Sequence, residues 1–372
     1  MAVFGTAIAQ EPLRIGVSLG LSGQYQNIAR FQQRAYELWE QHVNARGGIL
    51  GRRVQMTIRD DRSDPAVAKQ IYSDYILKEK VDFVIGPYSS PVTIAVAPIA
   101  DKHGHPLLAA GASSDELWRR QYTNVFGVYA SARRYAIGLL AMLATAGVER
   151  LAIVSVDDAF SLSAAESAKR WAPDYRLRVT LYRVEPKGKP DMLRAAQQAR
   201  ESGAQALMLA GHFNEAVLMR RALKQAGWMP AAYYATVGPV LPQYLEALGD
   251  DANGTFSTSQ WEAREDLRHA GSADFLRAYR TAYGETPSYH AATAYAAAQI
   301  LDQAIARAAS TDRAAVRQSL YRLDTSTVIG RYAVDKTGAQ IKGIPLIVQW
   351  QANQREIVWP EELRTAAPVL AR

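Results

Sequence analysis

The chain has 372 residues, 48% of them hydrophobic, which is enough for two cores because single domains usually contain roughly 100 to 200 residues. Charged residues make up 21%, and the apolar residues are scattered, which excludes a disordered chain and a run of the roughly 20 apolar residues that span a bilayer. The formal net charge is +7, but Lys and Arg are interspersed with Asp and Glu, which argues against nucleic-acid binding, and the absence of cysteine excludes disulfides and Cys-ligated metals.

Residues 1–10 are expected to be the remnant of an export signal. Ala7-Ile8-Ala9 fits the small-x-small pattern of signal cleavage sites, although a basic region and a full apolar core are missing. An apolar N-terminal tail is the alternative. The export interpretation predicts a periplasmic protein, and a chain without cysteine suits that oxidising compartment.

From Leu13 onward, short apolar runs alternate with amphipathic segments, a pattern typical of a parallel sheet covered by helices on both faces. The predicted strands are Leu13–Leu19, Val54–Ile58, Val81–Ile85, Pro106–Ala109, Leu151–Ser155, Leu177–Tyr182, Ala206–Ala210 and Tyr233–Thr236. The predicted helices are Ile28–Ala45, Pro65–Leu77, Ser131–Ala146, Met192–Glu201 and Asn214–Ala226.

The pattern restarts after Gly147, because the apolar run Leu151–Val154 begins a second series of strands and helices, which predicts a second lobe. Beyond Trp261 the order changes to three helices followed by two strands. Since these helices need a surface to pack on, we expect the chain to return to the first lobe. The late segments are predicted at Ala270–Tyr283, Ala291–Ala309, Asp312–Tyr321, Val328–Val334 and Ile344–Gln351.

Motifs for catalysis and cofactor binding are missing from the sequence, which has no GxSxG, HExxH, P-loop or CxxC. The turn Gly16–Gly23 follows a strand but lacks the GxGxxG spacing of dinucleotide sites. His103 and His105 have no third ligand nearby, so an exposed turn is favoured over a metal site. Asp60 and Asp61 resemble paired acids, but a solvated strand end explains them equally well. We therefore predict a non-catalytic protein without a cofactor or bound metal.

Three turns of small residues each follow an apolar strand: Leu21–Gly23, Gly86–Ser90 and Ala110–Ser114. The carboxyl ends of parallel strands share one edge, where backbone N–H groups, hydroxyls and helix N-termini can bind an anion. The turns therefore predict an anion site at that edge. The alternative is that Ser90 and Ser113 are ordinary helix N-caps.

At these turns the sequence resembles the type 1 periplasmic binding proteins of the branched-chain amino acid transport family, over Leu13 to about Pro360. The most specific stretches are IGVSLGLSG from Ile15, VNARGGILGRRVQMTIRDDRSDPAVA from Val43, VDFVIGPYSSPVTIAVAPIA from Val81 and GHPLLAAGASSDEL from Gly104. Looser matches follow in the same order, namely LAIVSVDDAF from Leu151, LMLAGHFNEAVLMRRALKQAGW from Leu207 and PSYHAATAYAAAQIL from Pro287.

The resemblance implies an α/β fold of two Rossmann-like lobes joined by three crossover segments, with the ligand in the inter-lobe cleft and closure by a hinge motion. The crossovers are expected near Val128–Ala132, Ser259–Trp261 and Tyr332–Asp335. The implied N-terminal lobe contains residues 11–130 and 260–334. The implied C-terminal lobe contains residues 131–259 and 335–372.

The resemblance also implies how a ligand is held, because family members bind the ligand carboxylate with the turns after the third and fourth strands. The corresponding residues are Ser90, Gly111, Ala112 and Ser113. Where amino-acid binders place acidic residues for the α-ammonium group, this chain has Val237 and Ala132. Burying an ammonium group without a counter-ion costs several kcal/mol, which disfavours an amino-acid ligand. Arg133 and Arg134 lie beside the first crossover and face either the cleft or solvent.

Aromatic and histidine residues at other expected cleft positions suit stacking on a planar ring. They are Tyr25, Tyr88, Tyr129, Phe160, His212, Trp261, Tyr289 and His290. Together with the missing acids, they favour an aromatic or other non-amino organic acid as the ligand.

We therefore expect a periplasmic solute-binding protein of an ABC uptake transporter, whose partners are a small-molecule carboxylate and the permease–ATPase complex of the inner membrane. Neither membrane insertion nor nucleic-acid binding is expected. One alternative is a branched-chain amino acid binder in which Asp158 or Glu215 replaces the lost acid. Further alternatives are a ligand-sensing regulator or receptor domain and an NAD-dependent enzyme of doubly wound fold.

Overall fold

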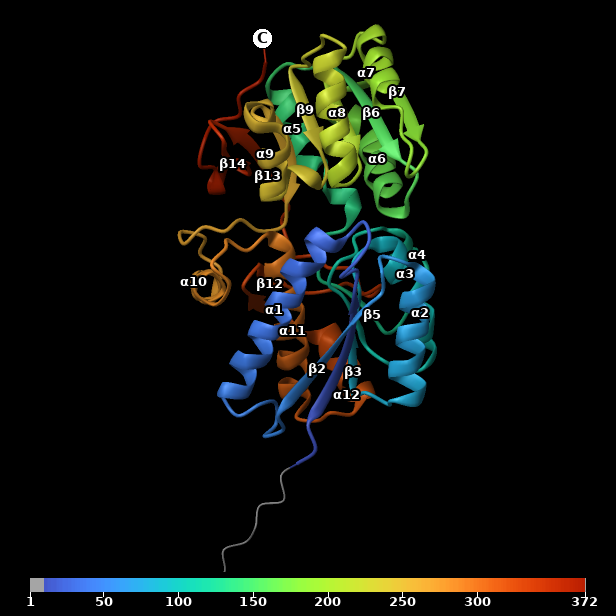
Figure 1. The fold of residues 1–372 in the computed structure, drawn as a ribbon, viewed down its shortest axis with the longest axis vertical. Helices are drawn as coiled ribbons and strands as arrows, with labels where there is room; N and C mark the ends of the chain where they lie inside the picture. The colour runs from blue at the N-terminus through green and yellow to red at the C-terminus, as the bar shows by residue number, and fades with distance from the viewer. Residues whose placement is uncertain (1–9, 372) are drawn as a thin grey trace, which may run out of the picture. The chain divides into compact units, whose positions relative to one another are not determined.

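Two large sheets and a two-stranded one organise the chain in the computed structural model, which describes residues 10–371 (Figure 1). Unit 1 contains the described residues up to Gly111, together with Tyr122–Val128 and Arg268–Gly338. Unit 2 contains Ala112–Gln121, Tyr129–Leu267 and the described residues from Ala339 onward. The expected N-terminal lobe included residues 112–121, whereas the structure places these residues in unit 2. The expected remnant of an export signal, apart from Gln10, lies outside the described residues.

Unit 1 is built on a five-stranded parallel sheet with the order β2-β1-β3-β4-β5. Its strands are β1 (Leu13–Leu19), β2 (Val54–Asp60), β3 (Phe83–Ile85), β4 (Leu107–Ala109) and β5 (Val125–Gly127). The central strands β1, β3 and β4 are buried almost throughout, as expected for aliphatic runs covered by helices on both faces. Their carboxyl ends point to one edge of the sheet, which holds the turns of interest.

Helices cover this sheet, and α1 packs against α11 while α2 packs against α3. The helices of unit 1 are α1 (Gln26–Ala45), α2 (Pro65–Ser73), α3 (Ser90–Lys102), α10 (Ser272–Tyr283), α11 (Tyr289–Ala308) and α12 (Arg313–Arg322), with a π-helical turn at Asp74–Lys78. Asp64 shows why α2 begins where it does, because its carboxylate accepts hydrogen bonds from Ala66 N at 2.6 Å and Val67 N at 3.3 Å. The late helical block thus belongs to unit 1.

Unit 2 contains a seven-stranded sheet with the order β14-β13-β10-β9-β8-β6-β7. Strands β6 to β10 pair in parallel, whereas β13 pairs antiparallel with β10 and β14. The strands are β6 (Arg150–Val156), β7 (Arg178–Glu185), β8 (Ala206–Ala210), β9 (Ala232–Ala235), β10 (Thr255–Ser259), β13 (Leu346–Gln351) and β14 (Gln354–Trp359).

Alternate residues of β6 enter two different cores, which shows that both faces of this sheet are covered. Leu151 and Ile153 belong to one hydrophobic cluster, and Ala152 and Val154 belong to the other. The helices are α4 (Glu116–Arg119), α5 (Ile137–Thr145), α6 (Ala159–Trp171), α7 (Met192–Glu201), α8 (Phe213–Gln225) and α9 (Pro242–Leu248). Short 3-10 turns lie at Ala132–Arg134, Ala172–Tyr175, Gly238–Val240, Gly249–Ala252 and Glu361–Leu363.

Two elements that were predicted as continuous are each interrupted in the structure. The helix predicted over Ser131–Ala146 is a 3-10 turn followed by α5, and the N–H groups of Arg134 and Tyr135 accordingly donate to the carbonyls three residues earlier. The strand predicted over Val328–Val334 is part of a hairpin of β11 (Thr325–Thr327) and β12 (Gly330–Tyr332). Gly330 permits the reversal because its φ of 101° is favourable only for glycine. None of the helices in residues 10–371 is long and apolar enough to cross a bilayer.

Candidate functional site

The turns that follow β3 and β4 lie side by side in unit 1. Tyr88 and Gly111 form a parallel bridge, and Gly86 N donates to Leu108 O at 2.8 Å. A Cβ atom on Gly111 would lie 2.9 Å from Tyr88 Cδ2, closer than real Cβ contacts, and 3.0 Å from Tyr88 Cα, which is tighter than most. Glycine at position 111 is therefore what lets the two strand-end turns approach each other.

The turn after β3 leads into α3, whose first residue is Ser90. Ser89, not Ser90, occupies the N-cap position, and its side chain makes no capping bond. Its buried Oγ has no hydrogen-bond partner among residues 10–371. Thr93 fixes the turn, because its Oγ1 donates to Pro87 O at 2.9 Å and its N–H donates to Ser89 O at 2.8 Å. The start of α3 thus combines a helix N-terminus with a buried hydroxyl, a combination that suits an anion.

Four of the predicted aromatic and histidine residues form one connected group in unit 1. The Tyr25 and Tyr88 rings meet edge to face with centroids 5.1 Å apart, and the Tyr88 and His290 rings do so at 5.5 Å. His290 stacks on Tyr289 with centroids 3.9 Å apart. All four side chains are buried. Because Tyr88 also bridges to Gly111, this aromatic group lies next to the strand-end turns.

Of the two interpretations of the acidic pair at the end of β2, the solvated strand end is wrong. Asp61 is fully buried and accepts a hydrogen bond from Ser18 Oγ at 2.7 Å. Burial raises the pKa of the Asp61 carboxyl to about 6, against the opposing effect of the Ser18 hydrogen bond. Asp60 accepts from Ser22 N at 3.1 Å and from Ser22 Oγ at 2.7 Å. The pair therefore ties the turn after β1 to the end of β2.

The expectation of an exposed turn at His103 and His105 is wrong for one of the two residues. His105 is buried, and Arg313 donates a hydrogen bond to its Nε2. Burial, aided by the Arg313 charge, lowers the pKa of His105 to about 4. The histidine is thus a neutral acceptor for an arginine of α12. In the described part of the chain, no three His, Asp or Glu side chains are arranged to hold a metal ion.

Ser113 belongs to unit 2, where its surroundings are polar and aromatic. Ser113 Oγ lies 3.1 Å from Tyr135 Oη, and the Tyr135 ring meets Phe160 edge to face with centroids 5.2 Å apart. The next residue, Ser114, donates to Ala159 O at 2.9 Å. These contacts fasten the segment 112–121 to the start of α6. The helix that follows begins at Glu116 with Asp115 at its N-cap, so neither Ser90 nor Ser113 is an N-cap.

An ion pair lies at the carboxyl edge of the unit 2 sheet. Asp158 follows β6 and His212 follows the neighbouring β8, with 3.4 Å between Asp158 Oδ2 and His212 Nε2. Burial alone would raise the pKa of Asp158, but the His212 charge and the hydrogen bonds from Ser161 lower it to about 2. Burial would likewise lower the pKa of His212, but the Asp158 charge outweighs burial and raises it. Each side chain thus favours the charged form of the other.

Both acids that could replace the missing ammonium partner are already engaged. Asp158 caps α6 by accepting from Phe160 N at 3.0 Å and Ser161 N at 3.1 Å, in addition to its pairing with His212. Glu215 accepts from His212 N at 3.2 Å in the capping box of α8. An ammonium group would have to compete with these contacts.

The two positions expected to carry acids lie in one apolar cluster of unit 2. Val237, at the end of β9, and Ala132 are buried in the same hydrophobic cluster as Tyr135 and Phe160. The Phe160 ring also approaches His212, with centroids 5.6 Å apart. This part of unit 2 therefore presents aliphatic and aromatic groups where amino-acid binders are expected to have carboxylates.

The remaining predicted residues have mixed surroundings. The Arg133 side chain is half exposed, with its Nε 3.9 Å from Asp115 Oδ1, whereas Arg134 is partly buried and donates to Ile341 O at 3.4 Å. Tyr129 and Trp261 are buried, and Ser259 Oγ donates to Trp261 O at 2.7 Å. Arg133 thus stays close to an acid in its own unit.

Sequence reasoning missed Ser89, Tyr135 and the Asp158–His212 ion pair. The spacing of residues could not distinguish Ser89 from Ser90, because the first residue of a helix is not readable to a single position. Tyr135 was placed inside a predicted helix. For the ion pair, the only available signal was that Asp158 and His212 each follow a predicted strand.

The topology defines the class of protein: the type 1 periplasmic binding fold, in which the chain builds two α/β units and enters each of them more than once. Residues 12–355 match the family described as Periplasmic binding protein, and the chain belongs to this family. The resemblance to type 1 periplasmic binding proteins of the branched-chain amino acid family is confirmed.

Known proteins match along nearly the whole chain. A Leu/Ile/Val-binding protein homolog from Brucella suis is 24% identical over 96% of this chain and 94% of its own. A leucine-binding protein from Thermotoga maritima superimposes with a TM-score of 0.84 at 20% identity, covering 93% of this chain and 97% of its own. A solute-binding protein of an ABC transporter from R. palustris, solved with benzoate, gives a TM-score of 0.80 at 19% identity, covering 97% and 98%.

Proposed function

We propose that this periplasmic solute-binding protein captures a small organic carboxylate without a positively charged amino group, with an aromatic acid as the favoured ligand. The supporting observation is the chemistry of the two positions expected to hold an ammonium group. Val237 and Ala132 lie in an apolar cluster, and the nearby acids Asp158 and Glu215 already have partners. A buried ammonium ion without a counter-ion would cost several kcal/mol, enough to remove micromolar affinity.

The anionic end of the ligand is assigned to the strand-end turns predicted from the sequence, namely Ser90, Gly111, Ala112 and Ser113. Support comes from the bridge between Tyr88 and Gly111 and from the helix N-terminus beside the buried Ser89 hydroxyl. Hydrogen bonds to a charged acceptor contribute roughly 1.5 to 3 kcal/mol each, so a few donors suffice for a carboxylate. Since these donors are neutral, the site does not depend on an arginine or lysine.

The aromatic preference rests on rings rather than on charge. In unit 1, Tyr88 is at the centre of the group that contains Tyr25 and His290, and in unit 2 Phe160 lies between Tyr135 and His212. Aromatic faces and edges pack well against a planar ligand. The benzoate bound to the R. palustris protein of the same fold supports this choice.

A branched-chain amino acid is the second candidate, because the Brucella relative is a Leu/Ile/Val-binding protein homolog and the T. maritima structure is a leucine-binding protein. In that case the ligand ammonium group would have to draw Asp158 away from His212. In either case the protein would deliver the ligand to an ABC permease and its ATPase. These partners are proposed because members of the family act with them. The protein itself performs no chemistry on the ligand.

Calorimetric titration of ligand-free protein with benzoate, 4-hydroxybenzoate and leucine tests the proposal. We expect an aromatic acid to bind at least about 100-fold more tightly than leucine, a difference of roughly 2.7 kcal/mol. Tight binding of leucine alone would overturn the ligand class. The double substitution Ser90→Ala and Ser113→Ala should weaken the bound acid at least tenfold, about 1.4 kcal/mol. Unchanged affinity in that variant would remove both serines from the site.

A further inference from the structure

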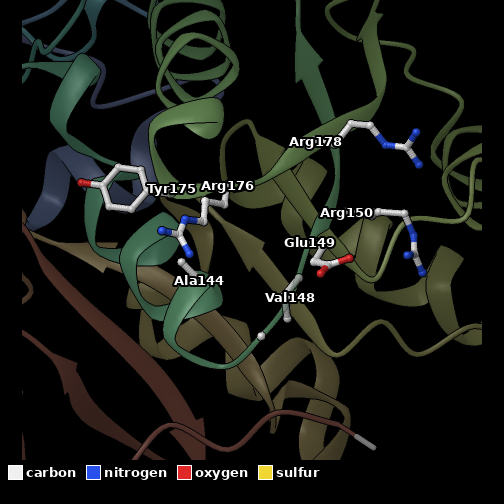
Figure 2. A pocket seen from close by; sticks show the side chains of 8 residues that line it. Ala144, Val148, Glu149, Arg150, Tyr175, Arg176 and Arg178 are labelled. Atoms are coloured by element: carbon white, nitrogen blue, oxygen red, sulfur yellow. The ribbon is translucent and has the colours of Figure 1, made fainter.

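A pocket lies wholly within unit 2, at the opposite edge of the sheet from Asp158 and His212. It has a volume of about 450 Å³ and is found where β6 and β7 begin (Figure 2). Its lining consists of Ala144, Gly147, Val148, Glu149, Arg150, Tyr175, Arg176 and Arg178, and we call it the arginine pocket. None of these residues was assigned a role above.

The lining carries three guanidinium groups and a single carboxylate, that of Glu149. Within residues 10–371, no ion pair involves Arg150, Arg176 or Arg178. In Figure 2, the Arg150 and Arg178 side chains extend in the same direction, and Arg176 lies on the other side of Glu149. The pocket therefore has an excess of positive charge that the protein does not neutralise with neighbouring acids.

Hydrogen bonds of the backbone hold the pocket wall in place. The arginine side chains are then the groups that can contact a ligand. Gln205 Oε1 accepts from Glu149 N at 2.9 Å and Arg150 N at 3.1 Å, and Arg178 N donates to Glu149 O at 2.8 Å. Arg150 Nε donates to Gly203 O at 2.6 Å, which orients its guanidinium and leaves the terminal nitrogens for other acceptors. A preoriented guanidinium loses less conformational entropy when it binds an anion.

Arg176 occupies a backbone conformation in which glycine is usually favoured. Its φ is 59° and its ψ is 27°, and its N–H bonds to Ala172 O and Pro173 O at the end of a 3-10 turn. A left-handed conformation costs a residue with a Cβ about 1 kcal/mol or more. The adjacent Tyr175 is partly buried against the core, so the turn presents an anchored ring beside an exposed guanidinium. The Arg176 guanidinium is therefore held at a fixed turn on the pocket wall.

We propose that the arginine pocket binds a phosphate-bearing anion, either a soluble phosphate compound or the headgroup of an anionic phospholipid. Three guanidinium groups against one carboxylate complement a ligand with about two negative charges. The guanidinium fork matches phosphate oxygens with two parallel hydrogen bonds, which a monocarboxylate can satisfy only once. This site is independent of the proposed carboxylate ligand, because it uses other residues at the opposite sheet edge.

Binding to the full-length protein is measured by calorimetry with pyrophosphate and by co-sedimentation with vesicles of phosphatidylcholine containing phosphatidylglycerol. The test variant is Arg176→Gln with Arg178→Gln, and the matched control is Arg194→Gln, an exposed arginine of α7. We expect the double variant to lose at least tenfold in affinity for the probe that binds, the control to behave as the wild type, and titration with benzoate or leucine to be unchanged by both.

Binding of pyrophosphate that the double variant weakens supports a soluble ligand, and weakened binding of the vesicles alone supports a lipid headgroup. Failure of both probes to bind the wild type overturns the proposal. So does binding that the double variant leaves intact or that Arg194→Gln reduces equally, because the charge would then act from the surface at large. Equal melting temperatures of the three proteins show that a loss of binding is not a loss of folding.

Discussion

The carboxyl edges of the two sheets have the same topology but different chemistry. In unit 1, the edge holds neutral donors, such as Ser89 at the start of α3, close to Gly111 and a group of aromatic rings. In unit 2, it holds the Asp158–His212 ion pair beside the apolar Val237. Parallel strands decide where loops converge, whereas the residues in those loops decide which ligand groups can be bound. This difference in chemistry is what the proposed ligand class depends on.

The largest effect is expected from a substitution that places a charge in the apolar cluster at the carboxyl edge of the unit 2 sheet. Val237→Glu should lower the free energy of unfolding by about 4 kcal/mol at pH 7, because it buries a carboxylate among aliphatic and aromatic groups. The glutamine of Val237→Gln has nearly the shape of glutamate without its charge, so this variant should lose clearly less free energy of unfolding than Val237→Glu. Urea denaturation at pH 7 and pH 5 measures both, and the gap should narrow at pH 5 as the buried carboxyl becomes protonated.

The same substitution also tests the ligand class. A glutamate at position 237 should weaken the binding of an aromatic acid, because it adds a negative charge where the wild type has none. If Val237→Glu is as stable as Val237→Gln and gains affinity for leucine, the position faces a cation and the proposed ligand class is wrong.

A second substitution removes the ion pair at that edge. His212→Asn keeps a residue that can cap α8 but deletes the partner of Asp158, and it should cost roughly 2 kcal/mol of stability. Because the folded pKa of Asp158 lies below its unfolded value, its contribution is complete above about pH 4 and is lost as the pH falls toward about 2. Because the folded pKa of His212 is raised, its contribution is complete below about pH 6.5 and is lost as the pH rises through that folded value.

The difference in stability between the wild type and His212→Asn should therefore be largest between about pH 4 and pH 6.5. Denaturant unfolding at pH 3, 5.5 and 8 measures it. The exposed His103 provides the control, and His103→Asn should show no such maximum. A difference that does not vary with pH would mean that His212 contributes by packing and not by its charge.

The sequence predicted most of the apolar strands and missed four strands, namely β5, β10, β11 and β14. β1 and β8 have the predicted bounds, because aliphatic runs between turn residues are unambiguous. β10 was not predicted, since its residues TFSTS show no apolar run, yet it is completely buried. Its hydroxyls are satisfied instead of being exposed, with Ser257 Oγ donating to Ala235 O at 2.7 Å and Thr258 Oγ1 donating to Tyr135 O at 2.8 Å.

Only part of the candidate site could be predicted from the sequence, because some of its contacts depend on the order of the strands in the sheet. The turns after β3 and β4 could be predicted to meet because they follow consecutive strands, and Tyr88 does bridge to Gly111. The pairing of Asp158 with His212 could not, because it depends on β6 lying next to β8 with β7 at the edge of the sheet. Strand order is a property of tertiary packing, and hydrophobic periodicity does not contain it.

The smallest effects are expected from two substitutions that each remove one buried hydroxyl, one in unit 1 and one in unit 2. Ser89→Ala removes a hydroxyl that has no partner among residues 10–371, so stability should be unchanged or rise by up to about 1 kcal/mol, whereas affinity for the carboxylate ligand should fall about fivefold. Ser257→Ala removes a hydroxyl that donates to Ala235 O, so stability should fall by about 1 kcal/mol without a change in affinity. Thermal unfolding and calorimetric titration of the two variants give both quantities. Because an unpaired buried donor costs stability unless a ligand uses it, Ser89→Ala should separate stability from binding. A loss of stability in Ser89→Ala with no loss of affinity would show that this hydroxyl serves the fold and not the ligand.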